Sequence, residues 1–218
     1  MASTAPRVRK DVVRNRRRIL EAAKELFAAR GLGVTLHDIA RHAGVGVGTI
    51  YRHFPDKAEL IDLLFEEQLE RMAELAHQAL ADPDPWRAVV WFHEQSLELQ
   101  SRDRGLKELL LGIPDAPQRA VKWRHRLHPL AAQIIERAQA AGVVRPDCET
   151  QDFGVVVLMV GAVIDAARDV SPDLWRRYLT LALQGLRPAS SPPEPLDVPA
   201  VSPQQMEDLL IGAWRHRS

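Results

Sequence analysis

The sequence predicts an all-α protein, with an N-terminal three-helix domain that contains a helix-turn-helix and, after it, a larger bundle of helices. Apolar residues recur at helical spacing along most of the chain, a Gly-containing turn separates two short helical segments within 35–57, and no segment alternates as a strand does. The chain has 218 residues, of which 46% are apolar, enough for one large or two modest globular units. We expect domains at 1–55 and 56–187, then a Pro-rich linker and short helix at 188–218.

The N-terminal segment 1–10 is small, proline-containing and basic, and we expect a flexible arm. Two interpretations stay open: a solvated tail, or an arm whose basic residues lie in or near a DNA minor groove. The first helix is predicted from Asp11 to Arg30, because apolar residues there share one face. Four arginines crowd its start, which the helix dipole disfavours, so we favour an anionic partner such as DNA phosphate. These arginines are Arg14, Arg16, Arg17 and Arg18.

The next helix is predicted to begin after Thr35, a good N-cap residue. Asp38 follows three positions later, where its carboxylate can complete a capping box. Gly44 comes after the last residue of the apolar face, as is typical of a residue that ends a helix in the left-handed region. We therefore expect a short helix between Thr35 and Gly44.

A second short helix is predicted from Gly46 to His53, with Ile50 and Phe54 as apolar anchors on one side. Asp56 then caps a long helix. In a helix-turn-helix of this spacing, the second helix lies in the DNA major groove. Small residues at its start permit close approach to bases, and larger residues at its end can reach phosphates. The candidate DNA-binding residues are Thr35, Gly46, Val47, Gly48, Thr49, Tyr51, Arg52, His53 and Lys57.

The segment TLHDIARHAGVGVGTIYRHFPDK, from Thr35 to Lys57, closely resembles the DNA-binding domain of the TetR (tetracycline-repressor) family of bacterial transcription regulators. The resemblance covers about the first quarter of the chain, and its many fixed positions make it specific. One position departs from the family pattern: Gly46 stands where many members carry Ser or another hydrogen-bonding residue. We expect the helix cap and phosphate contact at that position to be lost or made by backbone alone.

The charge distribution agrees with a DNA-binding head. The chain has no formal net charge, but residues 1–60 hold 12 Lys and Arg against six Asp and Glu. The remaining residues, 61–218, hold 17 basic and 23 acidic side chains, so the two parts carry +6 and −6. A basic head on an acidic body is typical of a DNA-binding domain joined to one that does not bind DNA.

The sequence argues against a disulfide-rich, membrane-spanning, metal-binding or enzymatic protein. Cys148 is the only cysteine, so no disulfide framework is expected. The longest apolar run, 153–164, is shorter than the roughly 18 residues of a membrane span, and we expect a cytoplasmic protein without membrane contact. His125 and His128 are three residues apart, but no cysteine or carboxylate completes a metal site. With no phosphate-binding loop or nucleophile elbow either, we expect no metal, no cofactor and no enzymatic activity.

The body is predicted to consist of helices separated by Pro- and Gly-containing breaks. Pro129 lies inside one of them, so we expect a kink or break near His128. Ser171 is expected to cap the last body helix, with Pro172 in its first turn. The predicted ranges are 56–81, 86–100, 106–111, 118–141, 150–169, 172–186 and 204–216.

A dimer interface is expected on the last two body helices. Gly154 and Gly161 are seven residues apart and permit close approach of another helix, from the same chain or from a second copy. The TetR resemblance implies a second copy, because members of the family dimerise through these helices as a four-helix bundle. The candidate interface residues are Gly154, Leu158, Gly161, Trp175, Tyr178, Leu179 and Leu183.

A small-molecule pocket in the body is also implied by the resemblance. Aromatic residues with a few polar partners are typical of such pockets, although large aromatics more often simply pack in a core. The candidate ligand-binding residues are Trp91, Phe92, Gln95, Trp123, Met159 and Asp165. We therefore expect a homodimeric repressor that binds a palindromic DNA operator and responds to a small-molecule effector. The alternative is a helical ligand-binding or enzymatic bundle whose helix-turn-helix head mediates protein contact.

Overall fold

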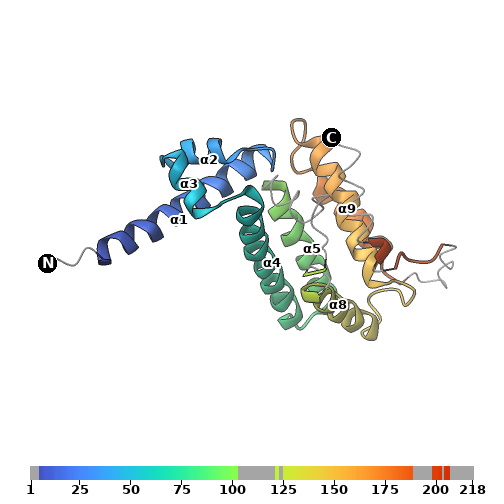
Figure 1. Cartoon of the computed structure of the whole chain (residues 1–218). Coiled ribbons are helices and arrows are strands. Elements are labelled where there is room, and N and C mark those ends of the chain that lie inside the picture. Colours follow the sequence, from blue (N-terminus) through green and yellow to red (C-terminus); the bar gives the residue numbers. More distant parts are fainter. Residues whose placement is uncertain (1–4, 103–120, 123–124, 189–197, 203, 207–218) are drawn as a thin grey trace. The chain divides into compact units, whose positions relative to one another are not determined.

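The computed structural model describes residues 5–102, 121–122, 125–188, 198–202 and 204–206, and the side chains from Val12 onward. Across these ranges the secondary structure is helical, with no strand, as predicted (Figure 1). The chain divides into two compact units, one extending to Glu67 and the other beginning at Gln68. The long helix α4, Lys57–Ala81, crosses this division.

Unit 1 begins with α1, Ala5–Arg30, a 26-residue helix. Its backbone is helical six residues before Asp11, so the expectation of a flexible arm at 1–10 was wrong for residues 5–10. Those residues contain no glycine, and the one proline, Pro6, lies in the first turn, where its missing N–H costs nothing. The predicted apolar face is buried, as are its counterparts on the short helices that follow: α2, Leu36–Ala43, and α3, Val47–His53.

Unit 2 contains the second half of α4 together with α5, Pro85–Arg102, α8, His128–Ala140, α9, Thr150–Ala167, and α10, Leu174–Gly185. The break expected near His128 is confirmed, because α8 begins there with Pro129 in its first turn. The expected cap of the last helix was wrong: α10 is preceded by Asp173, whose side chain makes no capping bond, and Ser171 lies in the turn before it. The predicted helix at 106–111 lies outside the described residues.

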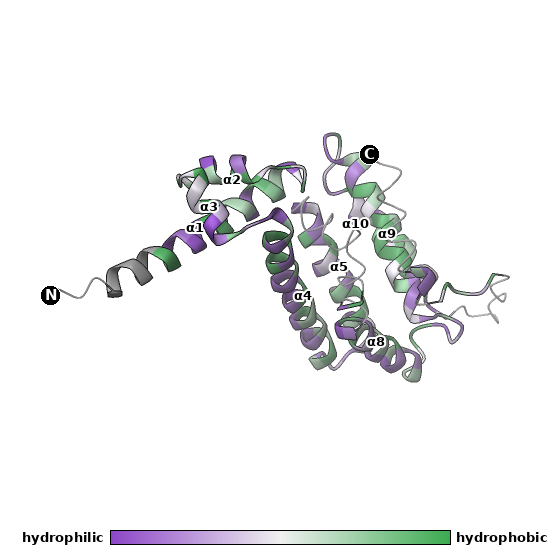
Figure 2. Cartoon of the chain, viewed as in Figure 1, coloured by the Kyte–Doolittle hydropathy of each residue, from purple (hydrophilic) through white to green (hydrophobic). Residues whose placement is uncertain are grey.

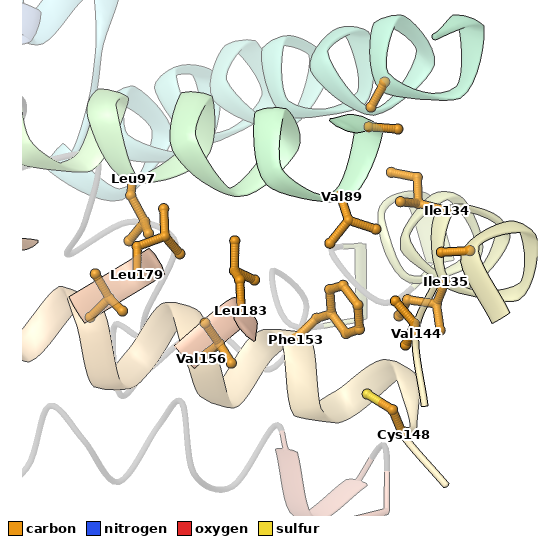
Figure 3. Close-up of a cluster of buried hydrophobic side chains, with 14 of the residues drawn as sticks. Val89, Leu97, Ile134, Ile135, Val144, Cys148, Phe153, Val156, Leu179 and Leu183 are labelled. Carbon is orange, nitrogen blue, oxygen red and sulfur yellow. The ribbon is translucent and has the colours of Figure 1, made fainter. Parts of the chain in front are cut away.

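The core of unit 2 joins α5, α8, α9 and α10. Figure 3 shows Val89 and Leu97 of α5 gathered with Phe153 of α9 and Leu183 of α10. Hydropathy follows this packing, since α9 is apolar along most of its length whereas α4 has one polar and one apolar side (Figure 2). By length and composition, α9 could cross a membrane. Six of its residues are buried, and four of them lie in this core, as expected of the central helix of a bundle.

A short segment of the C-terminal extension packs against α9. Ser202 and Gln205 form reciprocal backbone–side-chain bonds, with Ser202 N donating to Gln205 Oε1 at 2.8 Å and Gln205 N donating to Ser202 Oγ at 3.2 Å. This capping box starts the helical residues that contain Met206, which is buried. A side chain at Gly154 would bring its Cβ within 2.5 Å of Met206 Cε. The surface of α9 at Gly154, a candidate interface residue, is therefore covered by the chain's own C-terminal segment.

Candidate nucleic-acid interface

The first helix of the helix-turn-helix starts with the predicted capping box. Asp38 N donates to Thr35 Oγ1 at 3.2 Å, and Thr35 N donates to Asp38 Oδ2 at 3.2 Å. The Thr35 hydroxyl also donates to Asp38 Oδ2 at 2.5 Å. This hydroxyl bond, followed by the backbone bond from Thr35, holds the pKa of the exposed Asp38 carboxyl below its ordinary value. The capping box is confirmed, and Thr35 therefore has a structural role in starting α2.

The turn between α2 and α3 has the predicted geometry. Gly44 adopts φ 62° and ψ 39°, the left-handed conformation that glycine enters without strain. Gly46 is the N-cap of α3 and has no side-chain capping bond. Its carbonyl instead accepts from the backbone N–H of Thr49 at 2.8 Å and of Ile50 at 3.2 Å. The expected loss of a side-chain cap at this position is confirmed.

The second helix, α3, presents its outer face to solvent. Ile50 and Phe54 are fully buried, so they anchor α3 to the rest of unit 1. Val47 and Tyr51 are each 44% exposed. The remaining outer residues are exposed at Gly46, Gly48 and Arg52, and half-buried at Thr49 and His53. This helix is therefore held from one side and free to contact a large partner on the other.

The pattern analysis did not identify His37 as part of this face. It lies in the first turn of α2, is exposed, and its ring stands edge-on to the ring of Tyr51, with centroids 6.0 Å apart and planes at 79°. Edge-on geometry is the favoured arrangement of aromatic pairs. His37 therefore restricts the directions in which Tyr51 can extend from the surface of α3.

Two of the α1 arginines that are predicted to meet DNA phosphate also contact the protein itself. The guanidinium of Arg16 lies over the ring of Phe54, 4.8 Å from its centroid. Arg18 Nη2 donates to the carbonyl of Gly44 at 3.3 Å. These contacts join α1 to the turn and to the C-terminal end of the helix-turn-helix, and the cation–π contact adds about 0.5–1 kcal/mol. Both arginines therefore contribute to the fold of unit 1, and their contact with DNA phosphate stays a prediction.

The start of α4 is fastened to unit 1 at several points. Glu59 N donates to Asp56 Oδ1 at 2.8 Å, which confirms the predicted cap. The ammonium of Lys57 donates to the carbonyl of Leu32, in the loop between α1 and α2. Further along, Lys24 Nζ of α1 pairs with Glu67 Oε2 at 2.7 Å, and this hydrogen bond raises the pKa of Lys24. Lys57, a candidate phosphate contact, therefore also holds the fold together.

Unit 2 offers a second candidate site, for a small molecule. Of the residues predicted there, Trp91, Phe92 and Gln95 are half-buried on α5, and Asp165 is half-buried on α9. Met159 is 53% exposed, so its side chain faces outward, and Trp123 lies outside the described residues. Among the described candidates, Trp91 and Phe92 pack against the core of unit 2, whereas Met159 faces away from it.

Three polar residues lie on the buried face of α5, and two of them, Ser96 and Gln100, were not predicted. His93, Ser96 and Gln100 are each at most 2% exposed and follow one stripe of the helix at spacings of three and four. His93 Nδ1 is 2.8 Å from the Val89 carbonyl, and Ser96 Oγ donates to the Phe92 carbonyl at 2.6 Å. Burial lowers the pKa of His93 to about 4, so the ring is neutral near pH 7. The sequence signal that could have predicted this buried polar stripe is the spacing of polar residues at intervals of three and four within an apolar helix.

The candidate dimer residues fall into two groups. Trp175, Leu179 and Leu183 are 1–2% exposed within the core of unit 2, and Gly161 is also buried. These side chains pack inside their own chain, which corrects the expectation that they face a partner. Tyr178 is 45% exposed and Leu158 is half-buried, so they remain candidates. Leu181, 56% exposed, was not predicted.

Among the residues that the structure describes, no group of three His, Cys, Asp or Glu side chains could hold a metal ion. Cys148 is buried, and burial raises the pKa of its thiol to about 12. A thiol in this state is a poor nucleophile.

Comparisons with known proteins agree with this geometry. Residues 19–64 match the family model described as bacterial regulatory proteins, tetR family. Residues 84–188 match the model of the SbtR-like transcriptional regulator C-terminal domain. Curated relatives include HTH-type transcriptional regulators of Staphylococcus aureus, one of which is 41% identical over 63 residues, 28% of this chain and 34% of the relative. The match thus spans about a third of the length of these curated relatives.

Solved structures match over more of the chain. A TetR transcription regulatory protein from Mycobacterium vanbaalenii is 34% identical, with coverage of 83% of this chain and 99% of that chain and a TM-score of 0.54. The TetR regulator SCO0520 from Streptomyces coelicolor is 27% identical, with coverage of 80% and 99% and a TM-score of 0.59. FadR from Bacillus subtilis, solved in complex with stearoyl-CoA, shares the fold at 17% identity, with coverage of 78% and 99% and a TM-score of 0.62.

Proposed function

Because this chain belongs to the TetR family of bacterial transcriptional regulators, we propose that it is a cytoplasmic repressor that binds a palindromic DNA operator as a homodimer and releases it when an effector binds. Unit 1 is the DNA-binding part, and unit 2 carries effector binding and dimerisation. The proposal includes no enzymatic step and no cofactor.

One observation carries the DNA-binding part of the proposal. The outer face of α3 is free, with Val47 and Tyr51 each 44% exposed, while Ile50 and Phe54 fix the helix from behind. The N-terminal half of that face bears only small side chains, which lets backbone approach base edges, and its C-terminal half bears Tyr51 and Arg52. A helix with this distribution is suited to the major groove, with phosphate contacts at its end.

The homodimer is supported by apolar side chains left exposed on two adjacent helices. Met159 of α9 and Tyr178 and Leu181 of α10 are each about half exposed, although α9 and α10 pack on each other in unit 2. Large apolar side chains grouped at a surface are typical of protein interfaces. In a twofold dimer, two copies of α3 would meet half-sites separated by about 34 Å, one turn of DNA.

The proposed response to an effector uses α4, the helix that belongs to both units. A ligand in unit 2 would displace α4 and so change the separation of the two recognition helices. The ligand can do so only through unequal affinity for the DNA-bound and DNA-free separations. An effector that binds tightly but leaves operator affinity unchanged would contradict this part of the proposal.

A mobility shift against the DNA that flanks the protein's own gene, across a salt series, tests the proposal. We expect a specific complex whose affinity falls steeply with salt, because phosphate contacts release counterions. Tyr51→Phe should weaken binding to all sequences alike, and Thr49→Ala should cost about 1–3 kcal/mol of base discrimination. Equal binding of flanking and unrelated DNA by the wild type would contradict sequence-specific regulation.

Lys57→Ala needs a stability measurement beside the binding assay, because Lys57 also bonds to the Leu32 carbonyl. A phosphate contact predicts a salt slope lower by about one unit. If Lys57→Ala lowers stability and affinity while the salt slope stays unchanged, its role is structural only.

A further inference from the structure

Buried polar atoms without a hydrogen-bond partner occur on different helices of unit 2, and three of the four are amide oxygens, which accept. The atoms concerned are Gln68 Oε1 on α4, Gln100 Oε1 on α5, His128 Nε2 on α8 and Gln151 Oε1 on α9. Gln100 as a whole is only 2% exposed. A buried polar atom left unpaired destabilises the fold, so each such atom in a native fold requires an explanation.

The helix register places two of these atoms at one level. Only residues 82–84 separate α4 from α5, so the two helices run antiparallel, and both contribute alanines to the core of unit 2. Gln68 lies 13 residues before the end of α4, and Gln100 lies 15 residues after the start of α5. At 1.5 Å per residue, this difference is about 3 Å along the helix axes.

Contacts between α4 and the start of α8 indicate the level at which the third atom, His128 Nε2, lies along α4. Arg137 Nη1 donates to the Leu80 carbonyl at 2.7 Å, and Arg126 pairs with Glu70, so α8 follows α4 in the same direction. His128 comes two residues after Arg126 and therefore stands near the level of Met72 on α4. The three atoms thus span about 9 Å along the axes, a length that one small molecule can bridge. No contact places Gln151, at the first turn of α9, at this level.

The described polar side chains that share the buried face of α5 with Gln100 are uncharged. Among the described residues, the buried polar side chains are His93, Ser96 and Gln100, and none of them carries a charge near pH 7. The carboxylate nearest along α5, Glu98, is neutralised by Arg102, at 2.5 Å, and by Arg176. Burying an ionic group beside such residues without a counter-charge would be strongly unfavourable.

We propose that the effector of this regulator is an uncharged molecule with an apolar body and at least two hydroxyl or N–H donors, which bond to Gln68, Gln100 and His128. This inference rests on the proposed function of unit 2 as the effector-binding part. It also gives the effector a direct hold on α4, because Gln68 lies on that helix one residue beyond the division between the units. A carboxylate would not satisfy the two glutamine oxygens, because its oxygens accept hydrogen bonds and donate none.

The first test measures the ligand-free full chain. Gln100→Leu removes an unpaired acceptor and keeps the volume similar, so we expect an unchanged or higher melting temperature. Gln133→Leu, at an exposed position of α8, is the matched control. A melting temperature for Gln100→Leu that falls well below that of the control would show that Gln100 is bonded inside the protein, and would overturn the proposal.

The second test titrates a panel of probes against wild type and Gln100→Leu, with binding measured from thermal unfolding. The panel presents the same apolar bodies, linear and aromatic, as the primary alcohol, the primary amide, the methyl ether and the carboxylate. We expect alcohols and amides to bind the wild type, and Gln100→Leu to weaken them by about three- to tenfold. Tightest binding by carboxylates, equal binding by both proteins, or no binding by any probe would overturn the proposal.

Mobility shifts with both proteins distinguish a failure of the proposed effector class from a failure of the proposed DNA-binding function. If wild type and Gln100→Leu both bind flanking DNA but the probes fail, the chemical class of the effector is wrong and the DNA-binding function stands. If neither protein binds DNA, the proposed function itself fails.

Discussion

Acid should destabilise unit 2 through His93. The side chain is 1% exposed, its Nδ1 bonds to the Val89 carbonyl at 2.8 Å, and its ring centroid lies 4.9 Å from that of Phe153. Burial lowers the pKa from 6.5 to about 4, and the carbonyls of Val89 and Phe153 oppose this shift only in part. The unfolded chain therefore takes up the proton at a higher pH than the folded chain does. The stabilisation is complete above the unfolded pKa and is lost as pH falls from 6.5 toward 4.

The magnitude follows from the two pKa values. Each unit of difference is worth about 1.4 kcal/mol, so the full loss approaches about 3 kcal/mol by pH 4. About 2 kcal/mol of it should be lost between pH 7 and pH 5, where most carboxylates are still ionised. A loss of this size is a large fraction of the roughly 5–15 kcal/mol that stabilises a typical domain.

Urea denaturation followed by tryptophan fluorescence measures this loss in the right part of the molecule, because all five tryptophans follow Gln68 in the sequence. We expect His93→Gln to flatten the dependence of unfolding free energy on pH between 7 and 5 by about 2 kcal/mol. His77→Gln, which removes an exposed imidazole from α4, is the control. If His93→Gln keeps the slope of the wild type, the buried neutral imidazole does not account for the acid sensitivity, and the reasoning fails.

Four further predictions concern local structure. Gly44→Ala should lower stability by about 1–2 kcal/mol, because φ is 62°, a conformation that is strained for a residue with a Cβ. Gly48→Ala, where a Cβ meets nothing within 4 Å, should be neutral or stabilising in the same urea titration followed by circular dichroism. Thr35→Ala should cost about 1 kcal/mol by losing the cap of α2, and an unchanged midpoint would contradict the capping role. Cys148 should resist a thiol-specific disulfide reagent at pH 8 and react once urea unfolds the chain; rapid labelling of the folded protein would contradict its burial.

The helices and the turn of the DNA-binding unit could be predicted from the sequence because their signals are local. Thr35 with Asp38 specifies a helix start, Gly44 specifies a left-handed stop, and apolar periodicity identifies the buried faces of α1 and α3. Pro129 similarly located the start of α8. In each case, the residues that determine the geometry are within a few positions of one another.

The partners of the side chains could not be predicted in the same way. Arg16 stacks on Phe54, 38 residues away, and nothing in the run of arginines distinguishes a residue that packs from one that meets phosphate. The apolar stripe of α10 at Trp175 and Leu183 was assigned to a partner chain, but it fills the core of its own chain. Periodicity shows that a face is buried and leaves open what covers it.

The attachment of α4 to unit 1 has a consequence for domain exchange between regulators of this family. The bonds from Lys57 to Leu32 and from Lys24 to Glu67 make the first eleven residues of this helix part of the DNA-binding unit. The break at Pro55, where a chimera would ordinarily be joined, comes before all of them. A hybrid joined at Pro55 would lose both bonds, and α4 of the recipient would no longer be fixed to the transplanted DNA-binding unit. A hybrid joined after Glu67 would transfer the helix-turn-helix, the arginines of α1 that contact it and the start of α4 together.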